Sequence, residues 1–195
     1  YISAIFEFGR LLNEYPVSPF VDKARFQIGM CYFRQSREIH HDQEETERAI
    51  EEFTRFLEDF PNGEIAPEAR MRIQDLRDKL ARKRLMHARN YLKWRYPAAA
   101  AVYARLVLEE HSGSHVSKEA RFLLAKALRR QGELDEALTL LQGLKTDEIS
   151  DGLRKDVEKE LQQLKRDVAK QVSVSDRPGS ETVTESNAAT VPHPV

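Results

Sequence analysis

Three segments of the chain repeat one pattern of small and apolar residues at helical spacing. A small residue is followed four positions later by a ring or large apolar residue, three later by another apolar residue, and five further on by a helix stop. The sets are Ala4, Phe8, Leu11 and Pro16; Ala49, Phe53, Phe56 and Pro61; and Ala99, Tyr103, Leu106 and His111. Ala137, Leu141 and Leu144 form a fourth set without a stop. Each set shares one helical face, and its small residue lets a partner helix approach closely, which predicts paired antiparallel helices.

A partner helix precedes each later set. Two such helices carry Ala24, Ile28, Gly29 and Tyr32, and Ala120, Leu124, Ala125 and Leu128, while Gly132 stands at a turn before Ala137. This combination resembles the tetratricopeptide repeat, whose period is about 34 residues. One such unit cannot bury its apolar face alone, so the units are expected to stack. The resemblance implies an all-α fold, a right-handed solenoid of helix pairs.

Departures from the repeat period predict further features. The polar segment from Gln35 to Arg48 separates the two helices of one pair. No Gly or Pro interrupts Glu68 to Tyr96, which predicts one long central helix with Pro67 in its first turn. Its predicted seam consists of Ala69, Ile73, Leu76 and Leu80.

The end of the repeats is predicted to be covered by one more amphipathic helix, from Asp151 to Gln171. Its apolar side carries Leu153, Val157, Leu161, Leu164 and Val168. Residues 172–195 show no apolar period and are predicted to be a disordered tail. We therefore expect one solenoid over residues 1–171. It would open with the second half of a repeat, which favours an N-terminally truncated chain, and continue with about three helix pairs.

Composition and net charge limit the classes of function that the chain can have. The formal net charge is −1, which gives no global reason for nucleic-acid or membrane-surface binding. The single cysteine, Cys31, excludes an intramolecular disulfide and a cysteine-based zinc site. Between Met30 and Tyr32, we expect it to be a buried apolar residue. No segment approaches the roughly 20 apolar residues that span a bilayer.

Candidate chemistry is sparse. No phosphate loop, nucleophile elbow, dinucleotide fingerprint or zinc-protease motif occurs, so we predict neither enzyme activity nor a cofactor. Metal ligands gather only at His40, His41, Asp42, Glu44 and Glu45. Consecutive histidines lack the spacing that directs two rings at one ion, and Asp42 with Glu45 fits a helix capping box, so no metal site is predicted.

Charge is segregated along the chain. From Arg70 to Arg95 there are ten Lys or Arg and two Asp, whereas Glu44 to Glu68 holds nine acidic residues and two Arg. The two segments can be solvated or can neutralise each other across antiparallel helices, or the basic one can dock an acidic protein surface. Binding of nucleic acid is a third possible role of the basic segment. We predict no nucleic acid as a partner.

The first helices of the repeats are expected to line the inner face of the solenoid and to bind a partner there. Aromatic, Met and cationic residues at spacings of three and four would suit a peptide with aromatic residues and a carboxylate. For Phe26 and Phe33, packing between repeats is the alternative. The predicted partner-binding residues are Phe26, Met30, Phe33, Arg84, Tyr91, Phe122, Lys126, Arg129 and Arg130.

Several motifs resemble the BamD family of tetratricopeptide lipoproteins. The run from Tyr15 to Phe20 is similar to that family's YP-x-S-x-Y junction. The polar insertion ending at Thr46, followed by the set Ala49, Phe53, Phe56 and Pro61, resembles its third repeat. The run from Arg77 to Arg82, followed by Tyr91 and the segment 96–100, resembles its fourth. The likeness covers roughly residues 1–145.

The resemblance implies a non-catalytic scaffold of the outer-membrane β-barrel assembly complex, on the periplasmic face of the outer membrane. Its partners would be a BamA-like insertase, other subunits of that complex and unfolded outer-membrane protein substrates. It would meet the membrane only through an N-terminal lipid anchor that this chain lacks. The alternative is another periplasmic tetratricopeptide adaptor, for envelope or cell-division coordination, which binds peptides in its groove.

Overall fold

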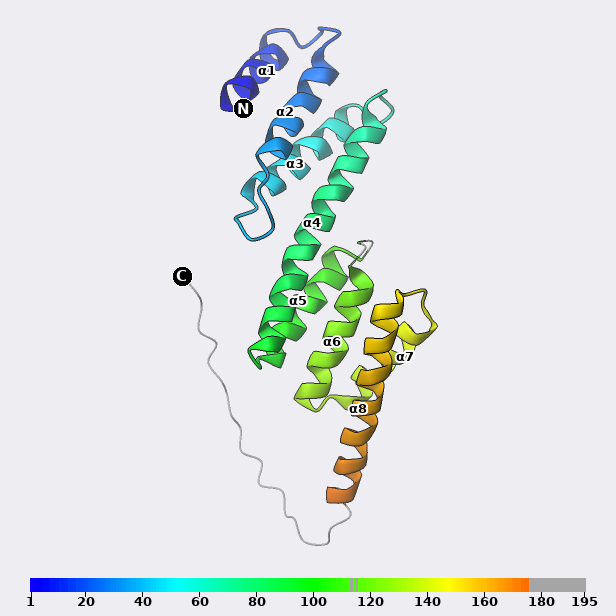
Figure 1. The fold of residues 1–195 in the computed structure, drawn as a ribbon. Coiled ribbons are helices and arrows are strands. Elements are labelled where there is room, and N and C mark those ends of the chain that lie inside the picture. Colours follow the sequence, from blue (N-terminus) through cyan, green and yellow to red (C-terminus); the bar gives the residue numbers. More distant parts are fainter. Residues whose placement is uncertain (113, 115, 176–195) are drawn as a thin grey trace.

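The computed structural model describes residues 1–112, 114 and 116–175, over which the chain forms eight α-helices and no strand (Figure 1). This confirms the all-α prediction. The helices are α1 (Ile2–Glu14), α2 (Val21–Gln35), α3 (Glu44–Asp59), α4 (Ala66–Lys93), α5 (Pro97–Glu110), α6 (Ser117–Gln131), α7 (Leu134–Thr146) and α8 (Asp151–Ser175).

The helices pack as a stack of pairs. Each one contacts the next along the chain, and α4 also contacts α6 while α6 contacts α8. Helices α4, α6 and α8 therefore form one row, as the first helices of successive tetratricopeptide units do. The helix α8 takes the place where a further repeat would begin, in agreement with the predicted capping helix.

The repeated stripe forms the buried contact in the later pairs, whereas Ala4, Phe8 and Leu11 of α1 are only partly buried. Ala49, Phe53 and Phe56 are 0% exposed, as are Ala137, Leu141 and Leu144. The third stripe is one residue later than predicted, since Ala100, Ala104 and Val107 are 0% exposed, whereas Ala99 and Tyr103 are only partly buried. The four alanines at 98–101 allow either register, and the sequence pattern alone led to the wrong one.

The one-residue shift of the stripe also applies to the residues that end α5. His111 is the C-cap of α5, with φ −135, and matches Tyr15 and Phe60, the C-caps of α1 and α3, each with φ −131. Ser112, rather than His111, therefore occupies the position of Pro16 and Pro61.

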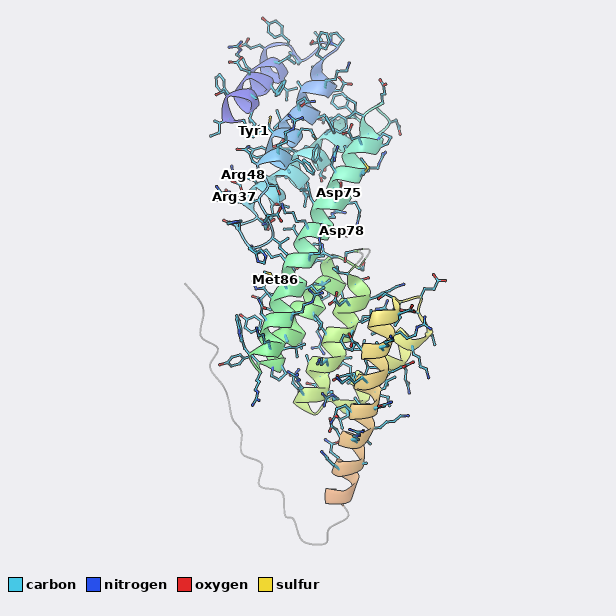
Figure 2. All side chains as sticks on the ribbon, in the orientation of Figure 1. Tyr1, Arg37, Arg48, Asp75, Asp78 and Met86 are labelled. Atoms are coloured by element: carbon cyan, nitrogen blue, oxygen red, sulfur yellow. The ribbon has the colours of Figure 1, made fainter. Side chains whose placement is uncertain are left out.

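The long helix α4 joins two apolar cores. Its first half contributes Ile73 and Leu76 to a core with α2 and α3, and its second half contributes Leu85 and Leu92 to a core with α5–α8. Figure 2 shows Asp78 near the middle of α4, between these two bodies. The helix begins two residues and ends three residues before its predicted limits, with Pro67 in its first turn as predicted.

The last helix is longer than predicted. It runs to Ser175 instead of Gln171, so its final turn includes the first residues assigned to the tail. Val157 and Leu164 are each 1% exposed against α6 and α7, but Val168 is 37% exposed. The rest of the predicted tail, residues 176–195, lies outside the described residues.

Candidate functional site

A cleft lies where the loop between α2 and α3 meets α4 and α5. It has a volume of about 220 Å³ and combines carboxylates, cations and rings from four segments of the chain. It lies close to the junction of the two cores. Its lining residues are Asp42, Gln43, Glu47, Leu80, Lys83, Arg84, His87 and Tyr103.

Gln43 organises the loop that forms one wall of this cleft. Its buried amide donates to the carbonyls of Glu38 and His41, both at 3.0 Å, and its Oε1 accepts from Thr46 at 2.8 Å. Gln43 is also the N-cap of α3, without a side-chain cap bond, so the predicted Asp42–Glu45 capping box is wrong. Asp42 instead accepts a hydrogen bond from the backbone N–H of Gln43 at 2.7 Å.

Two lysines of α4 fasten the loop to the long helix. Lys79 Nζ donates to Ser36 Oγ at 2.7 Å, and Lys83 Nζ donates to the His41 carbonyl at 2.6 Å. Burial lowers the pKa of Lys79. These bonds span more than 40 residues of sequence and hold the cleft wall in place.

The opposite wall is aromatic. Tyr103 of α5 stacks on Tyr91 of α4 with centroids 5.3 Å apart and an interplanar angle of 17°, and lies 5.2 Å from the ring of His87. Burial, followed by the charge of Lys83, lowers the pKa of His87, and burial raises the pKa of Tyr103. This wall therefore consists of aromatic rings with flat apolar faces.

Of the predicted partner-binding residues, Arg84 lines this cleft and Tyr91 supports its ring wall. Arg84 forms an ion pair with Glu110 of α5, so its charge is already shared within the chain. The prediction missed His87 and Tyr103. Tyr103 had been assigned to the buried stripe through the register error, and His87 carries no sequence signal beyond its helical spacing from Arg84 and Tyr91.

The predicted N-terminal set lies on α2 and mainly belongs to the core. Phe26 is 5% exposed, with its ring 5.3 Å from that of Phe53 and 5.7 Å from that of Phe56. Met30 and Phe33 are partly buried against the same core, and the Arg72 guanidinium lies 5.0 Å from the Phe33 ring. Phe26 therefore packs inside the molecule, as the alternative prediction stated.

The predicted C-terminal set is covered in part by α8. Phe122 is 7% exposed, and Lys126 Nζ lies 5.8 Å from its ring. Arg129 donates to Glu160 at 2.6 Å and to Asp167 at 2.5 Å, both on α8. The hydrogen bond from Arg129 lowers the pKa of Asp167. Arg130 donates to the Leu92 carbonyl at 2.7 Å. Sequence reasoning placed these cations on a partner surface, whereas α8 of the same chain binds Arg129.

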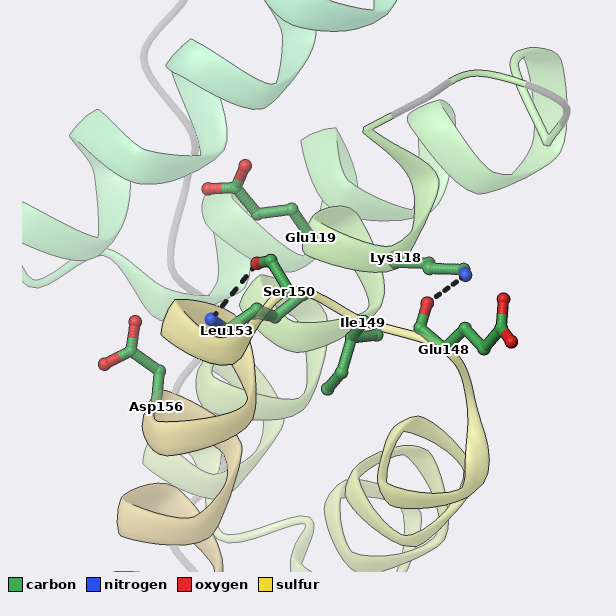
Figure 3. Close-up of a pocket in the computed structure, with 7 residues that line it drawn as sticks. All are labelled: Lys118, Glu119, Glu148, Ile149, Ser150, Leu153 and Asp156. Atoms are coloured by element: carbon green, nitrogen blue, oxygen red, sulfur yellow. Dashed lines mark hydrogen bonds between the residues drawn. The ribbon is translucent and has the colours of Figure 1, made fainter.

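A second pocket of about 410 Å³ marks the start of α8 (Figure 3). Lys118 donates to the Glu148 carbonyl, and the Leu153 N–H donates to Ser150 Oγ at 3.4 Å. Glu119 of this pocket is paired with Arg89 of α4. These contacts fix the α7–α8 connection. Within the described residues there is no group of three or more His, Cys, Asp or Glu arranged to hold a metal ion.

The basic segment forms ion pairs within the chain, as one alternative predicted, but Arg72 pairs with Glu68 of the acidic segment in the same helix and not across antiparallel helices. Arg84 and Arg89 of α4 pair with α5 and α6, while Arg48 and Arg55 pair within α3. Cys31 is buried as expected, and burial raises the pKa of its thiol. Over the part of the chain that the structure describes, no helix has the length and apolarity to cross a membrane.

Stacked tetratricopeptide-type helix pairs define a helical-repeat protein, and this one carries a mixed polar and aromatic cleft. The YfiO family, described as outer membrane lipoprotein, matches residues 1–141, which include both walls of the cleft. The chain belongs to this family.

Individual relatives agree with the family match. The outer membrane protein assembly factor BamD of Caulobacter vibrioides is 33% identical over 137 residues, 70% of this chain and 45% of that protein. BamD of Rickettsia prowazekii is 27% identical over 137 residues, 70% of this chain and 55% of that protein. The chain therefore spans about half the length of these relatives, 45% and 55%. A solved tetratricopeptide repeat protein from Parabacteroides merdae is 16% identical, with a TM-score of 0.35, and the likeness covers 91% of this chain and 74% of that one.

Proposed function

We propose that this chain is a non-catalytic scaffold in the assembly of outer-membrane β-barrel proteins. It would work at the periplasmic face of the outer membrane, dock a BamA-type insertase, and help to receive unfolded outer-membrane protein substrates. The observation that carries this proposal is the family match over residues 1–141, together with two relatives named as assembly factors.

The cleft is the surface that we assign to protein recognition. It brings Asp42 and Glu47 together with Lys83, Arg84 and the Tyr103 ring in one cleft. A partner segment with one charge of each sign and an apolar side chain would meet a complement for each group. Because the loop wall is fastened to α4 by Lys79 and Lys83, little ordering is needed on binding, which favours affinity.

Co-purification from solubilised outer membranes tests this function. The tagged chain is expected to retain a β-barrel insertase, and Tyr103→Ala is expected to reduce that retention by about tenfold, the loss typical of one interface aromatic. Tyr15→Ala is the matched control, since Tyr15 is exposed in the α1–α2 turn, away from the cleft. Circular dichroism checks that both variants fold.

The outcomes separate the alternatives. Failure of the wild-type chain to retain any β-barrel protein, with other envelope proteins recovered instead, would favour a different periplasmic adaptor. Equal retention by both tyrosine variants would leave the scaffold role but remove the cleft as its docking surface.

A further inference from the structure

The turn between α4 and α5 displays two large rings around a strained arginine. Trp94 is 59% exposed and Tyr96 is 63% exposed, and Arg95 between them has φ 65. The turn is closed by bonds from Tyr96 N to the Tyr91 carbonyl at 2.9 Å and from Arg95 N to the Leu92 carbonyl at 3.3 Å. This is the pair of bonds of a Schellman motif, in which the residue with positive φ is usually glycine.

The end of α6 shows the same motif with the usual residue. Gly132, with φ 89, follows α6, and Glu133 N and Gly132 N bond to the Leu128 and Arg129 carbonyls. At the equivalent place after α4, Arg95 holds a backbone conformation that costs a side-chain-bearing residue free energy. Such strain is a reason to look for a role of the side chain.

Cations converge beside this turn. A pocket of about 410 Å³ is lined by Leu92, Lys93, Arg95, Pro97 and Arg130, three cations and no carboxylate. Among the described residues, neither Lys93 nor Arg95 forms an ion pair.

Backbone ends add to the positive potential of the pocket. Arg130 donates to the Leu92 carbonyl at 2.7 Å and so offsets the negative end of α4. Helix α5 begins at Pro97 without a side-chain cap, which leaves its first N–H groups available to an anion.

We propose that this cationic edge, formed by Lys93, Trp94, Arg95, Tyr96 and Arg130, binds the anionic phospholipid surface of a membrane. Phosphate is the anion that matches guanidinium and ammonium groups beside a helix N-terminus. Free phosphate would engage the cations alone, whereas exposed Trp and Tyr favour the boundary between lipid headgroups and acyl chains. Cations beside such rings supply attraction to anionic lipid.

This contact would orient the repeats at a membrane without any spanning segment. It goes beyond the predicted lipid anchor, because it uses residues of the repeats themselves. It does not depend on the proposed insertase docking, because the cleft between the α2–α3 loop, α4 and α5 shares no lining residue with the pocket of this edge.

Trp94 makes the test direct, since it is the only tryptophan in the chain. The protein is titrated with vesicles of phosphatidylethanolamine and phosphatidylglycerol, and separately with vesicles of phosphatidylcholine alone. We expect a blue shift of Trp94 fluorescence and its quenching by brominated acyl chains with the anionic vesicles only. The partition should weaken as salt is raised.

Charge variants assign the binding to this edge. The triple variant Lys93→Gln, Arg95→Gln and Arg130→Gln is expected to partition about a hundredfold less, about fivefold for each cation. The control Arg10→Gln, Arg48→Gln and Arg55→Gln makes the same change in net charge at three exposed, ion-paired arginines. It should partition like the wild type.

A second variant separates binding from folding. Arg95→Gly with Lys93→Gln relaxes the turn while removing two cations, so it should melt no lower than the wild type yet partition about twentyfivefold less. Absence of a Trp94 shift with anionic vesicles, or an equal loss in the control triple variant, would overturn the proposal. Displacement of the vesicles by inorganic phosphate at low concentration would assign the edge to free phosphate. A shift caused by polyglutamate but not by vesicles would assign it to an acidic protein.

Discussion

Gly29 of α2 faces the ring of Phe53 on α3 so closely that a Cβ atom at Gly29 would lie 2.7 Å from Phe53 Cδ1 and Cε1. Phe53 is 0% exposed and its ring packs 5.3 Å from that of Phe26. The ring therefore has no free space into which it can move. This contact explains why α2, the first helix of its pair, carries glycine at position 29.

Gly29→Ala is expected to destabilise the fold despite the better helix propensity of alanine. The propensity gain is about 1 kcal/mol, whereas overpacking a filled core costs about 1–3 kcal/mol and a contact this short lies at the upper end. Thermal melting measures the net loss. Gly143→Ala in α7 is the control, because a Cβ there meets nothing within 4 Å and should leave stability unchanged or raise it. Equal melting temperatures for Gly29→Ala and Gly143→Ala would contradict the close contact.

The sequence was sufficient for the helix pairs, the long helix and the capping helix because each depends on local apolar spacing. It did not identify which residues of α5 form the buried face. In α3, Phe53 and Phe56 mark the buried face by size, whereas the four alanines at 98–101 provide no such mark. The position of His111 relative to Pro16 and Pro61 was misjudged for the same reason.

Two alanines of α5 provide a matched test of the corrected register. Ala100→Arg places a long cation in a 0% exposed contact and should cost about 3 kcal/mol or more. Ala99→Arg, at a partly buried neighbouring position, should cost far less because the side chain can reach solvent. Denaturant unfolding of the two variants decides the register, and equal losses would count against it.

The candidate site was less predictable because it depends on contacts between distant parts of the chain. The bond from Lys83 to His41 joins residues 42 positions apart, and Arg129 meets Glu160 across 31 positions. No spacing rule within a single helix identifies such partners. The sequence therefore led us to predict an open surface at Phe26, Phe122 and Arg129. In the structure the two rings are buried and Arg129 is paired with α8.

Arg129→Met should loosen the attachment of α8. Glu160 would lose its cation at a side chain only 9% exposed, a change that costs about 3 kcal/mol when a buried pair is broken. Hydrogen exchange of α8 amides should rise more than exchange elsewhere. Arg154→Met, at an exposed position of α8, is the control. If the double variant Arg129→Met, Glu160→Leu is no more stable than Arg129→Met alone, the buried carboxylate is not the cause of the loss.

Acidification should destabilise the fold through His111. Both of its ring nitrogens are buried, and neither has a hydrogen-bond partner among the described residues. Burial, followed by the charge of Arg84, lowers the pKa of His111 below 6.5, with Glu110 opposing. Between the folded pKa and 6.5 the unfolded chain binds more protons, so the stability present above pH 6.5 is lost as the pH falls. His111→Phe, which copies Phe60 at the equivalent position of α3, should reduce the fall in melting temperature between about pH 7 and about pH 5. His87→Phe removes a second histidine whose pKa is lowered by burial, so the double variant should be the least sensitive to pH. If His111→Phe keeps the full slope of the wild type, His111 is not the group whose protonation opposes folding.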